Sequence, residues 1–233
     1  MTLAVPEEIY PIAAVKCDEA MVWPWGTDEE ILEKAKGCTA AVIGPGLGQR
    51  ERAETLVLRL VKELTCPIIL DADGLNIISR HMDVLDEREA PTILTPHDGE
   101  FARLSGCELP IRDRLGAARG FVCRHPGCAL VLKGYRTITI PGMAIPGTAC
   151  VCLINSTGNS GMAKGGSGDV LAGLMGGLEA QEGCGPYAYD RAALAVWLHG
   201  RAGDLAAEDK GEYGMTPSDL IGQIPYAMKE LVN

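Results

Sequence analysis

The sequence predicts an α/β fold with a mostly parallel central sheet that helices cover on both faces. Short β-rich apolar runs recur over the first two thirds of the chain, and each leads through glycine or a turn into a helical pattern. These runs are continuously apolar instead of alternating, which is typical of strands buried on both sides. The last third is helical, and a length of 233 residues suits a single domain over 1–233.

The expected strands and helices alternate along the chain. The strand runs are TAAVIG (39–44), CPIILDAD (66–73), PTILTPHD (91–98) and CALVLKG (128–134), with RTITI (136–140) as a further extended piece. The helical patterns after the first three runs are a segment near 51–64, GLNIISRH and GEFARLSG. Apolar residues three and four apart then predict three helices, in GDVLAGLMGGLEAQ, YDRAALAVWLHGRAGDLAAE and TPSDLIGQIPYAMKELV.

The composition argues against several classes of protein. With 47% hydrophobic and 22% charged residues the chain is globular in type, and a net charge of −10 argues against nucleic-acid binding, which favours a basic face. The sequence shows no apolar run of bilayer length and no secretory signal pattern, so we expect a cytoplasmic protein. Nine cysteines without a CxxC pair indicate reduced, buried thiols rather than a zinc site or a disulfide framework.

Polar clusters follow four of the expected strands. They are GPGLG, DADGLN, TPHDGE and LKG. In an open parallel sheet ligands bind at the carboxyl edge of the strands, so four clusters arriving there predict a binding site. Common nucleotide fingerprints do not account for it, because GxxxxGK[ST] is absent and GPGLG is followed by Gln49 where GxGxxG requires glycine.

A glycine-rich stretch, NSTGNSGMAKGGSGDVLAGL (155–174), opens a helix. Exposed backbone N–H groups and the helix dipole make such an opening a cradle for anions. The residues of this anion hole are Gly165, Gly166, Ser167 and Gly168. Side chains at the three glycines would block a phosphate or forbid the φ angles that the turn needs. Lys164 is expected to add a positive charge to the same phosphate.

Asp169 directly follows this cradle, where a carboxylate repels a bound anion. Its presence is explained if it takes a proton from a hydroxyl group that attacks phosphorus, since phosphoryl transfer uses a base close to the nucleophile. The alternative is that Asp169 is only an acidic residue in the first turn of a helix, which the dipole favours. The pattern alone leaves both interpretations open.

Beyond these patterns, the sequence resembles the ribokinase-like superfamily and, within it, the ADP-dependent NAD(P)H-hydrate dehydratases, which repair hydrated nicotinamide cofactors. The blocks that carry the resemblance are VIGPGLG (42–48), ILDADGLN (69–76), ILTPHDGEFARL (93–104), LVLKG (130–134), TGNSGMAKGGSGDVLAG (157–173), VWLHGRAGDLAAE (196–208) and TPSDLI (216–221). GNSGMAKGGSGD together with TPHxGE is specific to this family. The resemblance implies a three-layer α/β/α sandwich and a lyase that uses ADP to restore NAD(P)H.

The resemblance also implies roles for individual residues. Asp169 is the implied catalytic base. The implied contacts to the substrate, NADHX or NADPHX, are Asp169, His97, and Gly46 or Gly48. The implied nucleotide-binding residues are Lys133, Gly134, Tyr135, Arg136, Thr137 and Gly168. Glu100 is implied to hold Mg²⁺ through water, and Asp71 is a second candidate for the metal.

The mechanism implied by the resemblance is a phosphorylation followed by an elimination. Asp169 takes the proton of the substrate's C6 hydroxyl group as that oxygen attacks the β-phosphate of ADP. Phosphate then leaves as the ring nitrogen's lone pair drives elimination, which gives NAD(P)H, AMP and phosphate, while Mg²⁺ neutralises phosphate charge. A homotetramer and an NAD(P)HX epimerase, fused or separate, are implied as partners.

Three features depart from the family pattern. The chain opens at MTLAVPEEIY, which looks like the family's second strand. We therefore expect a sheet one strand short and either a fragment of a bifunctional epimerase and dehydratase or a true start that lies upstream. Asp98 stands where proline is usual, and PGMAIPGTACVC (141–152) looks lengthened.

Several assignments have alternatives. Asp73 is equally well explained as a helix cap, His97 as part of a surface turn, and His199 as a structural histidine on a helix. For the whole chain, one alternative is a small-molecule kinase of the superfamily, such as a hydroxyethylthiazole or hydroxymethylpyrimidine kinase. Another is a nucleotide-binding subunit without catalysis. TPHDGE and GNSGMAKGG count against the kinase.

Overall fold

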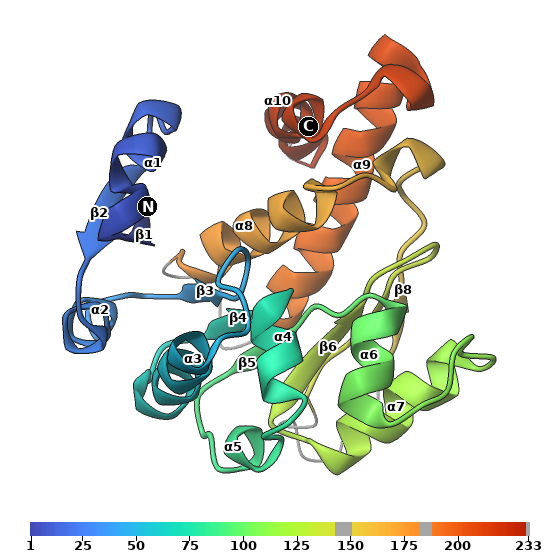
Figure 1. The fold of residues 1–233 in the computed structure, drawn as a ribbon. Helices are drawn as coiled ribbons and strands as arrows, with labels where there is room; N and C mark the ends of the chain where they lie inside the picture. The colour runs from blue at the N-terminus through green and yellow to red at the C-terminus, as the bar shows by residue number, and fades with distance from the viewer. Residues whose placement is uncertain (143–150, 182–187, 232–233) are drawn as a thin grey trace.

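A six-stranded sheet in the order β3-β4-β5-β6-β7-β8 is the centre of the molecule (Figure 1). The computed structural model describes residues 1–142, 151–181 and 188–231, so most of the segment that looked lengthened lies outside the described residues. The strands are β3 (Ala41–Ile43), β4 (Ile68–Leu70), β5 (Thr92–Leu94), β6 (Cys128–Leu132), β7 (Ile138–Ile140) and β8 (Leu153–Ile154). β3 to β6 pair in parallel, whereas β7 and β8 are antiparallel to their neighbours. The predicted mostly parallel sheet is confirmed.

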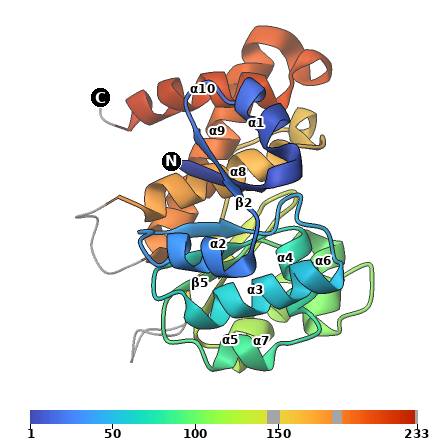
Figure 2. The same cartoon turned by 60° about the vertical axis from the view of Figure 1, so that its left-hand side comes forward.

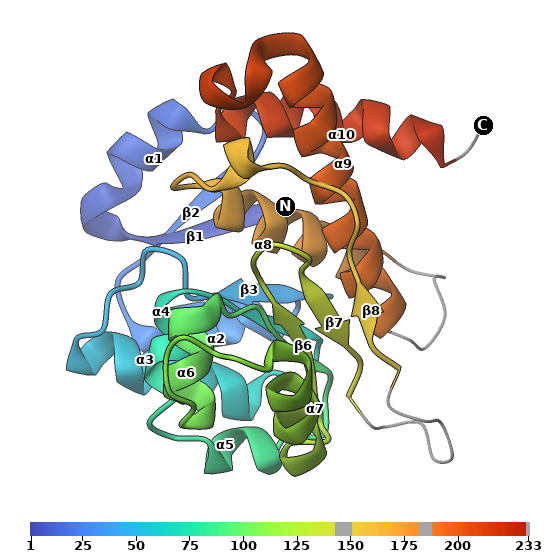
Figure 3. The same ribbon diagram turned by 90° about the vertical axis from the view of Figure 1, so that its right-hand side faces the viewer.

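Helices cover both faces of this sheet, which gives the predicted three layers (Figures 1 and 3). One face carries α3 (Glu51–Glu63), α4 (Asp73–Ile78), α5 (Asp83–Asp86), α6 (Asp98–Ser105) and α7 (Arg114–Arg124). The other face carries α8 (Ser167–Glu179), α9 (Ala188–Gly214) and α10 (Pro217–Glu230). Within α9 the helix is interrupted at Gly211, where φ is 71°. No helix in the described part of the chain is long and apolar enough to cross a membrane.

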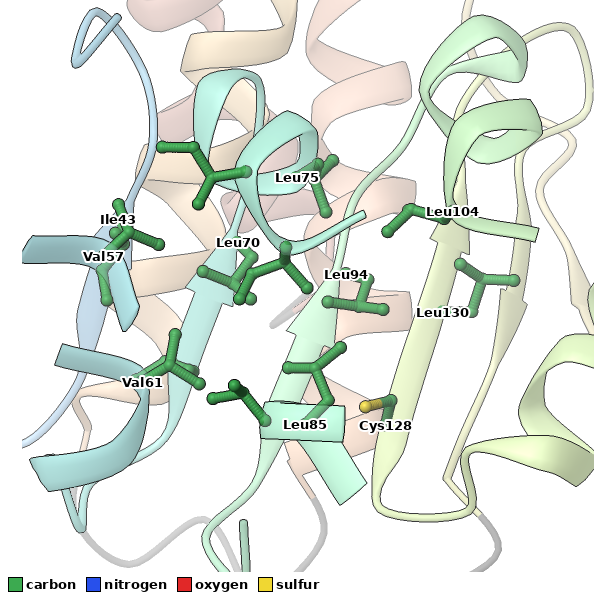
Figure 4. Close-up of a cluster of buried hydrophobic side chains, with 14 of the residues drawn as sticks. Ile43, Val57, Val61, Leu70, Leu75, Leu85, Leu94, Leu104, Cys128 and Leu130 are labelled. Atoms are coloured by element: carbon green, nitrogen blue, oxygen red, sulfur yellow. The ribbon is translucent and has the colours of Figure 1, made fainter. Parts of the chain in front are cut away.

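Alternate residues of the central strands point to opposite faces and build two hydrophobic cores. In β4, Ile68 and Leu70 belong to the core under α3 to α7, whereas Ile69 belongs to the core under α8 to α10. Leu94 and Leu130 extend the first core across the next two strands (Figure 4). This burial on both sides explains why the strand runs in the sequence are continuously apolar.

The opening segment forms a separate, two-stranded parallel sheet. Its elements are β1 (Thr2–Pro6), η1 (Glu7–Ile9), α1 (Tyr10–Lys16), β2 (Met21–Trp25) and α2 (Asp28–Ala35). We expected this segment to join the central sheet, but among the described strands β1 pairs with β2 alone, and the pair lies on the β3 side of the molecule (Figures 1 and 3).

The α2 helix connects this opening unit to the rest of the molecule. It packs beside α3 (Figure 2). Two ion pairs join these helices, from Arg59 Nη1 to Glu29 at 2.9 Å and from Arg52 Nε to Asp28 at 3.3 Å. Because at least one side chain of each pair is well exposed to solvent, we expect packing and not charge to hold α2 in place.

Seven of the nine cysteines lie in the described ranges, and all seven are free thiols, as predicted. The prediction that the thiols are buried holds only for Cys128 among these seven. Burial raises the pKa of the Cys128 thiol to about 12, so it stays protonated and packs as a small apolar side chain. Cys150 and Cys184 lie outside the described residues.

The glycine that follows β3 lets two loops at the carboxyl edge of the sheet touch. Gly44 has a φ of 133°, and a Cβ there would lie 1.8 Å from the Asp71 carbonyl oxygen and 2.7 Å from the Gly74 nitrogen. Gly46 has a φ of 73°, but a Cβ there would meet no atom within 4 Å. At Gly44 both the backbone conformation and the close contact require glycine. At Gly46 only the backbone conformation does.

We expect Gly44→Ala to lower the free energy of unfolding by about 3 kcal/mol or more, since a left-handed φ costs an alanine about 1–2 kcal/mol and the overlap with the neighbouring loop adds to it. Gly46→Ala is the matched control and should cost only about 1–2 kcal/mol. Urea unfolding of both variants measures the difference. Equal losses would contradict the close approach of the two loops.

Candidate active site

Most of the predicted site residues meet at one cavity of about 1180 Å³, beyond the carboxyl ends of β4, β5 and β6. The first turn of α8 and part of α9 form its opposite wall. The predicted residues that line it are Asp71, His97, Lys133, Gly134, Tyr135, Arg136, Thr137, Lys164, Gly165, Gly166, Ser167, Gly168 and Asp169. Gly46, Gly48 and Glu100 lie outside this lining. The volume exceeds the roughly 300–1,000 Å³ that is typical of one small-molecule site.

The glycine-rich stretch forms the N-terminus of α8, as predicted. Gly166 is the N-cap and has a φ of 96°, which favours glycine. Gly165 and Gly168 have no positive φ, so the predicted conformational need for glycine does not hold there. The Ser167 amide already donates to the Lys164 carbonyl at 3.3 Å, which leaves Gly168 as the better placed donor for a ligand. The open amides and the helix dipole make this wall of the cavity attractive to anions.

Asp169 lies in the first turn of α8 and faces the cavity. Its side chain is exposed, and among the described residues no hydrogen bond or ion pair engages its carboxylate. A carboxylate without a protein partner is available to accept a proton from a ligand. Its catalytic role stays a prediction, and its position beside the cradle is the one that such a role requires.

Three side chains from adjacent strands form a polar cluster at the floor of the cavity. Asp71 follows β4, Thr95 follows β5 and Lys133 follows β6. The Asp71 Oδ1 lies 2.7 Å from Lys133 Nζ and 2.8 Å from Thr95 Oγ1. The Asp71 carboxylate thus has a cation partner already, which argues against its predicted role as a magnesium ligand. The described residues contain no group of three or more His, Cys, Asp and Glu side chains that would hold a metal ion.

The ammonium of Lys164 is held by the end of α9. Its Nζ lies 3.0 Å from the Glu212 carbonyl oxygen, 3.2 Å from that of Tyr213 and 2.5 Å from that of Met215. Cations near a helix C-terminus bind the last carbonyl groups, and this is the role of Lys164 at the end of α9. Lys164 also lines the cavity, so its charge on a bound phosphate stays a prediction, while Lys133 is the lysine beside Gly168.

The predicted nucleotide-binding segment is an exposed turn between β6 and β7. Gly134 has a φ of 143° and Arg136 a φ of 56°. Tyr135 is 86% exposed, and the Arg136 guanidinium lies 5.4 Å from the centre of its ring. Thr137 Oγ1 donates to the Gly134 carbonyl group at 3.0 Å and closes the turn. The segment therefore presents an aromatic ring and a cation at the rim of the cavity.

Arg114 holds this turn from α7. Its guanidinium donates to the carbonyl groups of Lys133 at 2.8 Å and of Tyr135 at 3.2 Å. Asp98 accepts from Arg114 Nε at 2.9 Å. The aspartate that stands where the family usually has proline therefore fixes the arginine that supports the nucleotide-binding turn.

His97 and Glu100 together close the N-terminus of α6. The His97 Nδ1 accepts from the amides of Gly99 at 3.0 Å and Glu100 at 3.3 Å, while Glu100 Oε2 accepts from the His97 amide at 2.9 Å. The His97 side chain is 58% exposed and lines the cavity, so capping leaves it able to contact a ligand. Glu100 is buried in this cap, and its contact with magnesium through water stays a prediction.

Asp73 fixes the GPGLG loop beside the cavity. Its Oδ2 accepts from the Gly48 amide at 2.9 Å and its Oδ1 from Gln49 Nε2 at 3.0 Å. The alternative of a helix cap is wrong, because α4 begins at Asp73 and its N-cap residue is Ala72. Ala72 has a φ of 48° and lines the cavity, and a strained backbone of this kind costs about 1–3 kcal/mol.

Sequence reasoning placed residues 155–160 in the glycine-rich stretch but assigned none of them an individual role, and they line one side of the cavity. Thr157 Oγ1 donates to the Trp197 carbonyl group at 3.0 Å, and Asp204 accepts from the amide of the residue after Thr157 at 3.0 Å. Gly200 makes the contact possible, since a Cβ there would lie 2.2 Å from Thr157 Oγ1. The signal in the sequence was the pair of Gly200 and Asp204 in HGRAGD. Their spacing along α9 does not tell which other segment of the chain the helix contacts.

His199 joins α9 to the first turn of α8. Its Nε2 lies 2.9 Å from the Ser167 carbonyl oxygen. Burial lowers the pKa of His199 to about 4, the Lys133 ammonium adds to the lowering, and the bond to Ser167 opposes it. The imidazole is therefore neutral at pH 7 and Nε2 donates its proton to the carbonyl group, which supports the expected structural role.

The fold defines a ribokinase-like protein, and its cavity is lined by a glycine-rich helix N-terminus. In fold, the chain is similar to the hydroxyethylthiazole kinase of Pyrococcus horikoshii, with a TM-score of 0.68 and 16% identity over 98% of this chain and 86% of that one. The sequence profile of the NAD(P)H-hydrate dehydratase family matches residues 1–226. The chain belongs to this family.

Individual relatives agree with this membership. The bifunctional NAD(P)H-hydrate repair enzyme Nnr of Gloeobacter violaceus is 40% identical over 96% of this chain and 43% of its own length. The Nnr enzyme of Thermofilum pendens is 36% identical over 98% of this chain and 44% of its own length. The ADP/ATP-dependent NAD(P)H-hydrate dehydratase of Bacillus subtilis, co-crystallised with ATP and Mg²⁺, is 29% identical, with a TM-score of 0.77 over 98% of this chain and 78% of that one. The chain thus spans less than half the length of these two curated relatives.

We expect acid to destabilise the protein through His199. Because its folded-state pKa of about 4 lies below the ordinary 6.5, the unfolded chain binds a proton between these values that the folded chain does not, and stability is lost as the pH falls. His199→Gln keeps an N–H donor but does not titrate. The free energy of unfolding of His199→Gln minus that of the wild type should therefore increase as the pH falls from 6.5 to 4, by up to about 1.4 kcal/mol per pH unit. Urea unfolding at several pH values measures this, and a difference that is independent of pH would contradict a buried, neutral histidine.

Proposed function

We propose that the chain is an ADP-dependent NAD(P)H-hydrate dehydratase, which converts NADHX or NADPHX to NAD(P)H and releases AMP and phosphate. The observation that carries the proposal is the carboxylate of Asp169, which none of the described residues engages, beside the amide of Gly168 within one cavity. A binding site for anions alone would gain nothing from this carboxylate, whereas a phosphoryl transfer to an alcohol needs a base there. Membership of the family supports the choice of substrate.

The nucleotide would lie along the turn between β6 and β7. Tyr135 offers an exposed aromatic face for a base, and Arg136 lies over the same ring. From there the phosphates would reach Lys133 and Gly168, which lie close together. The relative that was co-crystallised with ATP and Mg²⁺ supports a nucleotide as a ligand, and its place at this turn and ADP as the donor are part of our proposal.

The hydrated cofactor would enter from the side of His97, with the GPGLG loop nearby. Asp169 accepts the proton of the substrate's C6 hydroxyl group. In the same step, the hydroxyl oxygen bonds to the β-phosphorus of ADP, and the bond from that phosphorus to AMP breaks. The ring nitrogen's lone pair then expels the phosphorylated oxygen from C6, and loss of a proton from C5 restores the dihydronicotinamide. Lys133 and the amides at the N-terminus of α8 would stabilise the charge that develops on the phosphoryl oxygens.

Magnesium fits this site as an ion held mainly by the nucleotide. Mg²⁺ in nucleotide sites keeps several waters and takes one or two carboxylates together with phosphate oxygens. Glu100, behind His97, would reach it through water, and the exposed Asp169 lies in the first turn of α8, beside the Gly168 amide that would bind a phosphate. When bound, the ion neutralises charge between the phosphates.

The proposal extends to the setting of the enzyme. We propose a cytoplasmic protein and a homotetramer, by resemblance to the family. The relatives named above are bifunctional repair enzymes, which supports an NAD(P)HX epimerase as a functional partner, either in the same polypeptide or separate. A superfamily kinase is the weaker alternative, because the likeness to hydroxyethylthiazole kinase, at 16% identity, concerns the fold alone.

Replacing Asp169 tests the proposed function. With purified protein, NADHX, Mg²⁺ and ADP or ATP, we expect dihydronicotinamide absorbance and AMP to appear together. Asp169→Asn should lower kcat by about 10²–10⁴-fold, the usual contribution of a general base, and leave ADP affinity nearly unchanged. Asp209→Asn, on the exposed part of α9, is the matched control and should behave as the wild type.

Other outcomes of this assay support the alternatives. Retained turnover in Asp169→Asn would remove the base assignment. A phosphorylated alcohol made from ATP would indicate a kinase. Binding of ADP without release of phosphate would indicate a non-catalytic subunit.

A further inference from the structure

We infer that Asp71 is a positioning residue, which holds the Lys133 ammonium at the N-terminus of α8 so that it meets the phosphoryl group in transfer. The inference rests on the proposed function and deepens it, because it gives a role in the reaction to a carboxylate outside the anion cradle. The observation behind it is a carboxylate that is 2% exposed and lies 2.7 Å from the ammonium of a lysine that lines the cavity.

The ammonium lies where a phosphate at the anion cradle would be. The Lys133 amide donates to the Pro96 carbonyl group at 2.8 Å, which sets the start of the side chain at the sheet edge. A Cβ at Gly168 would lie 3.4 Å from Lys133 Nζ, so the ammonium faces the first turn of α8. The side chain of Lys133 is 19% exposed, so it reaches the cavity without being fully solvated.

The charges at this point favour an anionic ligand. The ammonium faces the positive end of the α8 dipole, and these two repel each other. Asp71 balances one positive charge, and a bound phosphate would balance the remainder. The same ammonium contributes to the lowered pKa of His199, as expected for a cation at the junction of β6, α8 and α9.

Asp71 is itself fixed by its surroundings. Thr95 is 1% exposed, and its Oγ1 lies 2.8 Å from Asp71 Oδ1 and 3.1 Å from the Leu70 carbonyl oxygen. Leu70 and Leu94 are paired in the parallel ladder of β4 and β5, so the two residues that follow them lie side by side. A lysine side chain has many rotamers, and one fixed carboxylate oxygen selects the rotamer that points at the cradle.

A double-mutant cycle tests this coupling. Wild type, Asp71→Asn, Lys133→Ala and the double variant are compared for kcat with NADHX and ADP and, by calorimetry, for the dissociation constant of ADP. We expect each single substitution to lower kcat about tenfold or more, and the double variant to be no slower than Lys133→Ala. Losses in kcat that multiply in the double variant would overturn the inference.

Two further variants separate positioning from a general effect on the fold. Asp73→Asn is the matched control, because it makes the same Asp-to-Asn change two residues further along the chain, where the carboxylate accepts from the Gly48 amide. Its effect on kcat should multiply with that of Lys133→Ala. Thr95→Val loosens Asp71 without removing charge, and its effect on kcat should also vanish when Lys133 is absent. If circular dichroism shows that Asp71→Asn is unfolded, Thr95→Val replaces it in the double-mutant cycle. A loss in kcat that vanishes in the Lys133→Ala background would then support the inference, and a loss that multiplies would overturn it.

The measured dissociation constants of ADP test the inference independently of the proposed function. A wild-type protein that does not turn over NADHX would remove the proposed function, and the ADP dissociation constants would still decide the inference. Asp71→Asn should weaken ADP binding severalfold when Lys133 is present and not when alanine replaces it. ADP affinity that neither single substitution changes would overturn the role of this pair.

Discussion

The site depends on one geometric constraint, the meeting of three parallel strand ends with the N-terminus of one helix. Because β4, β5 and β6 run in parallel and in register, the residues that follow them emerge at a single edge. Asp71 and Lys133 reach each other across this edge, although 62 positions separate them in the sequence. The α8 helix brings the Gly168 amide and its dipole to the same point, so a cation and a positive helix end converge on one cavity.

Close packing of backbone segments keeps this edge in shape. Gly44 and Gly74 let two loops touch, and Gly161 lets the segment before α8 lie against α9, since a Cβ there would be 2.6 Å from the Glu212 carbonyl oxygen. Gly200 does the same for Thr157. The strained backbone of Ala72 sits among these contacts, at the cavity wall. Strain of this kind persists only where the surrounding structure fixes it, which indicates a rigid site.

The sequence predicted the layers, the strands β3 to β7 and the helices α3, α4, α6, α8, α9 and α10, because periodicity and burial on both sides of a sheet are local properties of the chain. It predicted neither α5 nor α7 nor β8. It also predicted which edge carries the site. It did not predict side-chain partners, since these depend on packing between distant segments. Lys164 lies beside the cradle in sequence but binds the end of α9, and Asp73 follows a strand but holds a loop instead of capping a helix.

The sequence also did not predict that the strands form two separate sheets. The runs in β1 and β2 are apolar like the others, and nothing local tells that they pair with each other alone among the described strands. The same limit applies to Asp71, whose residue type suits both a metal and a lysine. Only the position of Lys133 Nζ, 2.7 Å away, distinguishes the two roles.

The most direct measurement is a crystal structure of the protein with α,β-methylene-ADP, in which the bond to be broken is replaced by a stable one. The account predicts a terminal phosphate within about 3 Å of the Gly168 amide and of Lys133 Nζ, with the Asp169 carboxylate directed at the open side of that phosphorus. A terminal phosphate bound away from the start of α8, or an Asp169 side chain turned away from the nucleotide, would contradict it.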